Sequence, residues 1–273
     1  MLDSFLHCFI RDFKVRGQLK LRKAVLIICL VFYMGFFFIP ADGHAAAANH
    51  NRLADNRATK HIFFAGYEWE VKSGHYYPGK NDWLADNVWV DNEGFLHLKI
   101  THVGKQWYCA EVASVRRFGY GSYQFQVIAP VDKLDANIVL GLFVYPGPEN
   151  PDQKNELDIE FAKWGKPGQP IGNYTVTPSQ KTHHFSFSLE GDYTTHQFIW
   201  TKEQILFQSS YGHVMNDATE FSSWLYNTQE YDGKTAIPPV RVHMNLWLFM
   251  GKSPLDGQEQ EIIIKNFIFN FGT

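Results

Sequence analysis

Hydrophobic and polar residues alternate along most of the chain after residue 60, which is the pattern of half-buried β-strands. Six segments show this alternation or form short apolar runs of strand composition. They are residues 95–100, 120–128, 138–145, 183–189, 240–249 and 261–271. Turn-forming pairs such as Pro78-Gly79 and Asp232-Gly233 punctuate the chain, and one short helix or irregular segment is expected near residues 222–226. The pattern predicts an all-β fold, a two-sheet antiparallel β-sandwich.

The first 45 residues have a different character. Residues 24–39 are sixteen apolar or small residues without a charge, preceded by six Lys and Arg and followed by an alanine run at 45–48. This arrangement is typical of a secretory signal peptide, although an uncleaved signal anchor is the alternative because the apolar run approaches the length of a membrane span. Residues 46–60 are small and polar and are expected to form a linker to a domain at 61–273. Both alternatives predict export, to a secreted, periplasmic or extracellular location, or to a membrane anchor if the signal is retained.

Composition narrows the classes of function. The chain has 273 residues, 45% of them hydrophobic and 16% aromatic, so it is not a disordered protein. Without residues 1–45, which hold six basic and three acidic residues, 19 basic and 25 acidic residues remain, a net charge of −6. No basic tract outside the leader suggests a nucleic-acid partner, and a mildly acidic domain favours neutral substrates over polyanions. Cys8 and Cys29 lie in the leader, so Cys109 is predicted to be a buried free thiol.

The segment Asn155-Glu-Leu-Asp-Ile-Glu-Phe161 carries the candidate chemistry. Side chains alternate along a strand, so Glu156, Asp158 and Glu160 share one face, where their mutual repulsion disfavours full ionisation. The Cα atoms of the two glutamates are about 13 Å apart on an extended strand, and side chains that lean inward reach the roughly 5 Å of a retaining glycosidase. The alternatives are a Ca²⁺ site and a solvated outer face.

This motif resembles the E-[ILV]-D-[IVF]-E signature of glycoside hydrolase family 16, which includes lichenases and laminarinases. Further segments that resemble the family occur in family order, at residues 107–130, 141–148, 172–176, 195–200, 205–207 and 244–249. The resemblance covers most of residues 61–273. It implies a concanavalin A-like β-jelly roll with an open cleft, and a retaining endo-glycosidase that hydrolyses internal β-glycosidic bonds of a polysaccharide such as β-glucan.

The resemblance also implies roles for single residues. Glu156 would be the nucleophile, Asp158 its helper and Glu160 the acid/base, and the single residue between Asp158 and Glu160 favours mixed-linkage β-glucan. Glu111 is kept from the family's substrate-binding segment, but Ala113 stands where a sugar-binding arginine is expected. The catalytic residues therefore carry over, whereas the substrate subsites do not carry over intact.

A second predicted strand supplies candidate sugar contacts. Arg241, His243, Asn245 and Trp247 share one face of residues 240–249, where Trp247 could stack on a pyranose ring and Asn245 could bind its hydroxyl groups. The alternative is a tryptophan buried in a packed layer. The substrate-binding candidates are Glu111, Phe143, Tyr174, Asn245 and Trp247.

Two functional alternatives stay open at this point. One is a transglycosylase that uses the same residues, and the other is a non-catalytic carbohydrate-binding sandwich, which would typically have lost one of the two glutamates. No cofactor and no metal site is expected; a structural Ca²⁺ is compatible with the family, but no ligands are assigned. The expected partner is a polysaccharide, with no nucleic acid, and the protein is expected to be a monomer.

Overall fold

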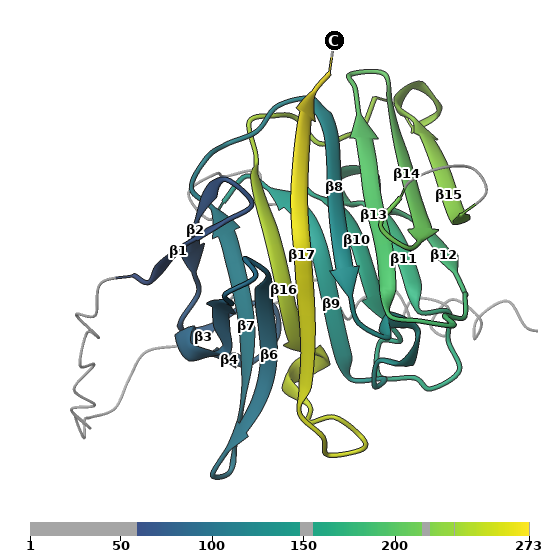
Figure 1. Ribbon diagram of the computed structural model, residues 1–273. Helices are drawn as coiled ribbons and strands as arrows, with labels where there is room; N and C mark the ends of the chain where they lie inside the picture. The colour runs from purple at the N-terminus through teal and green to yellow at the C-terminus, as the bar shows by residue number, and fades with distance from the viewer. Residues whose placement is uncertain (1–58, 148–154, 215–218, 232, 273) are drawn as a thin grey trace, which may run out of the picture. The chain divides into compact units, whose positions relative to one another are not determined.

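The computed structural model describes residues 59–147, 155–214, 219–231 and 233–272 (Figure 1). The predicted signal segment and most of the predicted linker lie outside these residues, so both stay predictions. Within the described part of the chain, no helix is long and apolar enough to cross a membrane.

Seventeen strands in the described part are joined by hydrogen bonds into one sheet that folds over itself into two layers (Figure 1). The first layer, here called the cleft layer, has the order β1-β2-β7-β16-β9-β10-β11-β12. Its strands are β1 (His61–Phe64), β2 (Tyr67–Val71), β7 (Gln106–Ser114), β9 (Ile138–Tyr145), β10 (Leu157–Ala162), β11 (Gly172–Val176), β12 (Lys181–Phe185) and β16 (Arg241–Leu248).

The second layer, the back layer, has the order β5-β6-β17-β8-β13-β14-β15. Its strands are β5 (Val88–Val90), β6 (Leu96–Val103), β8 (Gly121–Ile128), β13 (Tyr193–Trp200), β14 (Gln204–Tyr211), β15 (Glu220–Asn227) and β17 (Gln260–Phe271). The first half of β7 pairs with β6 and with β4 (Asn81–Trp83), which also pairs with β3 (Gly74–Tyr76), and its second half pairs with β2 and β16. Strand β7 thus links the layers, and the predicted antiparallel β-sandwich is confirmed.

The core fills the space between the layers, as strand alternation requires. On β10, Leu157, Ile159 and Phe161 are completely buried, and β14 and β13 contribute Phe207 and Phe198 from the opposite layer. Burial of each such side chain stabilises the fold by about 1.5–3 kcal/mol. This apolar inner face fixes which side chains of β10 point outward.

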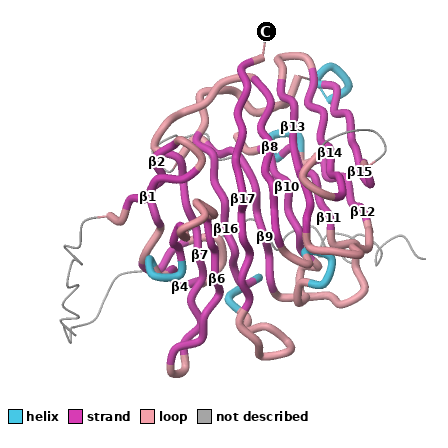
Figure 2. The backbone as a smooth tube through the Cα atoms, in the orientation of Figure 1, coloured by secondary structure: helices cyan, strands magenta, loops and turns pink. Residues whose placement is uncertain are grey.

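Helical structure in the described residues is limited to five 3₁₀ turns (Figure 2). They are η1 (Ala85–Asn87), η2 (Val131–Lys133), η3 (Thr177–Ser179), η4 (Thr228–Tyr231) and η5 (Phe249–Gly251). The expectation of a short helix or irregular segment near residues 222–226 was wrong, because β15 occupies these residues. Trp224 lies opposite Phe207 on β14 and stacks on it at 5.6 Å, a long-range pair that local sequence does not reveal. The predicted strand 183–189 is β12, but it ends at Phe185.

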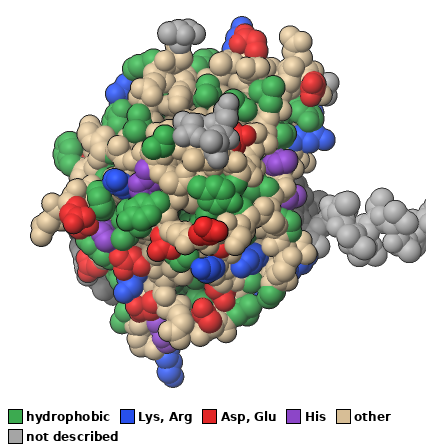
Figure 3. Space-filling view, turned by 45° about the vertical axis from the view of Figure 1, so that its right-hand side comes forward, with side chains coloured by type: hydrophobic (Ala, Val, Ile, Leu, Met, Phe, Trp, Pro, Cys, Tyr) green, Lys and Arg blue, Asp and Glu red, His purple; other side chains and the backbone are tan. Residues whose placement is uncertain are grey.

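Charge and thiol predictions can also be compared with the structure. On the face shown in Figure 3, acidic and basic side chains are interspersed rather than gathered by sign. Cys109 is completely buried and free, as predicted. Burial raises the pKa of its thiol to about 12, so the sulfur is unreactive.

Candidate active site

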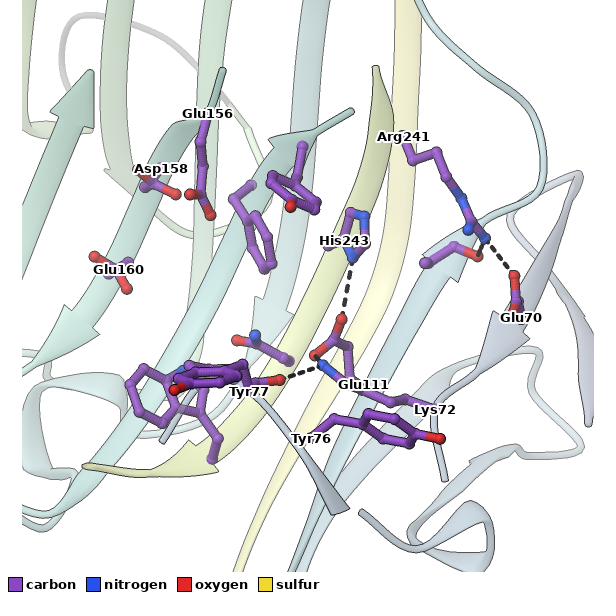
Figure 4. A pocket seen from close by; sticks show the side chains of 16 residues that line it. Glu70, Lys72, Tyr76, Tyr77, Glu111, Glu156, Asp158, Glu160, Arg241 and His243 are labelled. Atoms are coloured by element: carbon purple, nitrogen blue, oxygen red, sulfur yellow. Dashed lines mark hydrogen bonds and ion pairs between the residues drawn. The ribbon is translucent and has the colours of Figure 1, made fainter. Parts of the chain in front are cut away.

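An open cleft of about 720 Å³ lies on the outer face of the cleft layer (Figure 4). Side chains from β2, β3, β7, β9, β10 and β16, and from residues next to β2, β3 and β10, line it. The lining residues are Glu70, Lys72, Tyr76, Tyr77, Pro78, Glu111, Ala113, Phe143, Tyr145, Glu156, Asp158, Glu160, Arg241, His243, Asn245 and Trp247. The cleft therefore crosses several strands, which suits an extended ligand.

Strand β10 places three carboxyl groups at this cleft. Glu156 immediately precedes the strand, and Asp158 and Glu160 lie within it on the face opposite the buried apolar residues (Figure 4). The segment after β11 holds this strand from one end. The hydroxyl of Thr177 donates to Oδ2 of Asp158 at 3.1 Å, and its amide donates to the carbonyl of Glu156 at 3.1 Å.

The three carboxyl groups hold their protons with different strength. Burial raises the pKa of Glu156 to about 7, although a hydrogen bond with Asp158 opposes the increase. Burial and then the charge of Glu156 raise the pKa of Glu160 to about 8. Burial and the two flanking glutamates raise the pKa of Asp158 well above its ordinary value. A single negative charge on this strand is therefore carried by Glu156, while Asp158 and Glu160 hold their protons.

A second polar group lies across the cleft, where Glu111 is held from both sides. Its Oε1 is 3.1 Å from Nδ1 of His243, and its Oε2 accepts a hydrogen bond from Nζ of Lys72 at 2.8 Å (Figure 4). Burial alone would raise the pKa of Glu111, but the hydrogen bond with His243 and the charge of Lys72 bring it below the ordinary value. Burial lowers the pKa of His243. Glu111 is thus a carboxylate and His243 a neutral imidazole at pH 7.

The predicted sugar contacts follow β16 and β9. Asn245 and Trp247 line the cleft and are only 3% and 8% exposed. Asn245 lies over Gly141, where an added Cβ would be 2.5 Å from its Oδ1, so the glycine makes room for this side chain. The ring of Phe143 stacks on His243 with a centroid distance of 4.9 Å. Glu111, Phe143, Asn245 and Trp247 therefore lie at the cleft with the three carboxyl groups of β10.

Tyr174 does not lie at the cleft, so its predicted place there was wrong. The register of β11 against β10 sets Asn173 opposite Glu160 and Tyr174 opposite Ile159, so the tyrosine points into the core. It is completely buried, and its hydroxyl donates to Oγ of Ser209 on β14 in the back layer at 2.7 Å. It joins the two layers and cannot contact a ligand in the cleft.

Sequence reasoning missed the wall formed by residues before β4. Tyr76 and Tyr77 are 59% and 84% exposed at the cleft, a pair of adjacent aromatic residues beside Pro78-Gly79 that could have signalled a sugar platform. Arg241 forms an ion pair with Glu70 of β2 at 2.7 Å, a contact between positions 171 residues apart that no local pattern indicates. Among the described residues, no group of three His, Cys, Asp or Glu side chains is arranged to hold a metal ion.

Comparison with known proteins identifies the family. The sequence model described as glycosyl hydrolases family 16 matches residues 78–258, about two thirds of the chain. The chain belongs to this family. The matched range contains every predicted catalytic and sugar-binding residue, and the match confirms the family resemblance of the sequence.

Individual relatives and solved structures agree with the family 16 assignment. The β-glucanase of Paenibacillus polymyxa is 26% identical over 193 residues, which cover 68% of this chain and 73% of that protein. The β-glucanase of Paenibacillus macerans is 29% identical over 143 residues, which cover 50% of this chain and 59% of that protein. The solved β-glucanase of Bacillus licheniformis superposes with a TM-score of 0.57 at 21% identity, over 80% of this chain and 100% of that one, and thus shares the fold.

Proposed function

We propose that this family 16 member is an exported endo-β-glucanase that hydrolyses internal bonds of a neutral β-glucan with retention of configuration. The observation that carries the proposal is the position of Glu156, Asp158 and Glu160, whose carboxyl groups line the open cleft from one face of β10. Glu156 has the lower pKa, about 7, and Glu160 the higher, about 8. A retaining glycosidase needs this arrangement of one ionised and one protonated carboxyl group before the reaction.

In the first step, the carboxylate of Glu156 attacks the anomeric carbon while Glu160 donates its proton to the leaving glycosidic oxygen. Glu160, now a carboxylate, then acts as the general base. It removes a proton from a water molecule, whose oxygen attacks the anomeric carbon and displaces Glu156 from the glycosyl-enzyme. Asp158 shares a hydrogen bond with Glu156, which opposes the increase that burial causes in the pKa of the nucleophile and so favours its ionised form.

The substrate class rests on the cleft and on the relatives. The cleft is open, crosses several strands and presents aromatic rings beside carboxylates, so an uncharged extended polymer fits it better than a polyanion. The two Paenibacillus relatives are named β-glucanases. The apolar, uncharged segment at residues 24–39, with basic residues before it, supports export, which would bring the enzyme to polysaccharides outside the cell.

Release of reducing sugar from a panel of polymers tests the proposal. We expect activity on lichenan or laminarin and little on xyloglucan, agarose or carrageenan, with none for Glu156→Gln, which keeps the size of the side chain but removes the nucleophile. Binding to a polymer without any release would instead establish a non-catalytic carbohydrate-binding protein.

The stereochemistry and the acceptor are tested separately. Proton NMR of the first products should show the β-anomer before mutarotation, and an initial α-anomer would refute double displacement. If oligosaccharides longer than the substrate accumulate in place of free reducing ends, a sugar hydroxyl replaces water in the second step and the enzyme is a transglycosylase.

A further inference from the structure

One buried nitrogen in the cleft has no partner. His243 is 6% exposed and lines the cleft, and its Nδ1 faces Glu111, yet its Nε2 has no hydrogen-bond partner among the described residues. A buried polar atom that is left unsatisfied costs free energy and indicates a missing partner. The mechanism on β10 does not use this group.

The neighbours of His243 determine what this nitrogen can do. A carboxylate only accepts hydrogen bonds, so Nδ1 must carry the proton that it shares with Glu111. Lys72 secures the other oxygen of Glu111, and is itself fixed by a hydrogen bond to the carbonyl of Tyr77 and by the ring of Trp83, 4.2 Å below Nζ. In a neutral imidazole with a proton on Nδ1, the other nitrogen is a hydrogen-bond acceptor.

The position of His243 places this acceptor near the cleavage site but outside it. Strand β16 is separated from β10 by β9, which corresponds to about 10 Å across the sheet. The small side chain of Ala113 lies opposite His243 on β7, and the ring of Tyr145 meets the imidazole edge-on at 5.8 Å. Aromatic surface and a fixed acceptor together form a subsite for a sugar ring.

We propose that His243 is a substrate-binding residue whose Nε2 accepts a hydrogen bond from a hydroxyl group of a neutral sugar unit next to the cleavage site. The proposal rests on the proposed glucanase function and adds a specificity to it. A hydroxyl group can donate a hydrogen bond to Nε2. The carboxylate of a uronic acid has no proton to donate, so its oxygens would be repelled by the lone pair of Nε2. The Lys72–Glu111–His243 group therefore favours a neutral sugar over a uronic acid at this position.

Binding measurements on variants of the protein test this role. In the Glu156→Gln background, His243→Phe keeps a ring against Phe143 but removes the acceptor. By calorimetry, we expect about tenfold weaker binding of a mixed-linkage glucan hexasaccharide, equivalent to about 1.4 kcal/mol. His243→Gln, whose terminal oxygen reaches the place of Nε2, should recover at least about threefold of that loss. The matched control is His213→Phe, at the end of β14 away from the cleft, which should bind like the parent.

Nitrogen NMR of the imidazole gives a second reading that a purely structural role would not produce. We expect the proton on Nδ1 in the free protein, and a shift of the unprotonated Nε2 resonance when the oligosaccharide binds. A proton on Nε2, or equal affinity of His243→Phe and its parent, would overturn the proposal while the wild-type protein still hydrolyses glucan. A wild-type protein that neither binds nor cleaves any glucan would overturn the glucanase function, and this role with it.

Discussion

Replacement of Glu160 by glutamine should stabilise the protein at neutral and alkaline pH. The carboxyl group of Glu160 sits in a cleft beside Glu156 and Asp158, and burial with the charge of Glu156 raises its pKa from the ordinary 4.5 to about 8. The folded state thus holds this proton more tightly than the unfolded chain does. The stability that the group supplies is fully present below pH 4.5 and is lost as the pH rises toward 8.

The magnitude follows from the two pKa values. A difference of one between the folded and unfolded pKa corresponds to about 1.4 kcal/mol, so the change from 4.5 to about 8 sets an upper bound of about 5 kcal/mol. Water in the open cleft screens a side chain that is only partly covered, so we expect about 2 kcal/mol. Glu160→Gln should match the wild type near pH 4 and exceed it by this amount near pH 8.5.

Urea denaturation followed by tryptophan fluorescence, from pH 4 to 8.5, measures the difference. Glu190→Gln, at an exposed position after β12, is the control for loss of a carboxyl group at the surface. In a Glu156→Gln background, the gain from Glu160→Gln should shrink but not vanish, because burial still raises the pKa of Glu160 while the charge of Glu156 is gone. A gain that is the same at every pH, or a loss at pH 8.5, would refute the assignment of a raised pKa to Glu160.

Two further predictions concern activity and packing. The pH profile of kcat/KM on β-glucan should be bell-shaped, because Glu156 must be ionised and Glu160 protonated; activity should rise through pH 7 and fall through pH 8. A profile that is flat from pH 5 to 9 would contradict this pair. Tyr174→Phe should lower the free energy of unfolding by about 1 kcal/mol through loss of the hydrogen bond to Ser209, measured by urea denaturation, and should leave KM unchanged. A change in KM without a change in the free energy of unfolding would indicate that Tyr174 contacts the substrate, and would contradict its position in the core.

Alternation within a strand can be read from sequence, and it placed the side chains of two strands correctly. Glu156, Asp158 and Glu160 share the cleft face, as do Asn245 and Trp247. The register between strands cannot be read in this way, because hydrogen bonds between distant segments set it. Tyr174 was assigned by its aromatic character, whereas its pairing with Ile159 turns it inward.

The same limit explains why the Lys72–Glu111–His243 group was not predicted. Its members come from positions 39 and 132 residues apart along the chain, and each has an ordinary neighbourhood in sequence. Family resemblance indicated Glu111 and the missing arginine at the position of Ala113, but not the two residues that hold Glu111. The structure pairs Ala113 with His243 across β7 and β16, so the small residue and the histidine form one arrangement. The sugar-binding arginine that the resemblance implies on β7 is absent there, and Glu111 is held by Lys72 beside β2 and by His243 on β16. The predicted catalytic strand thus keeps all three carboxyl groups at the cleft, while the cleft lining around Glu111 differs from the one that the resemblance implies. We therefore expect substrate preference to differ where the Lys72–Glu111–His243 group lines the cleft.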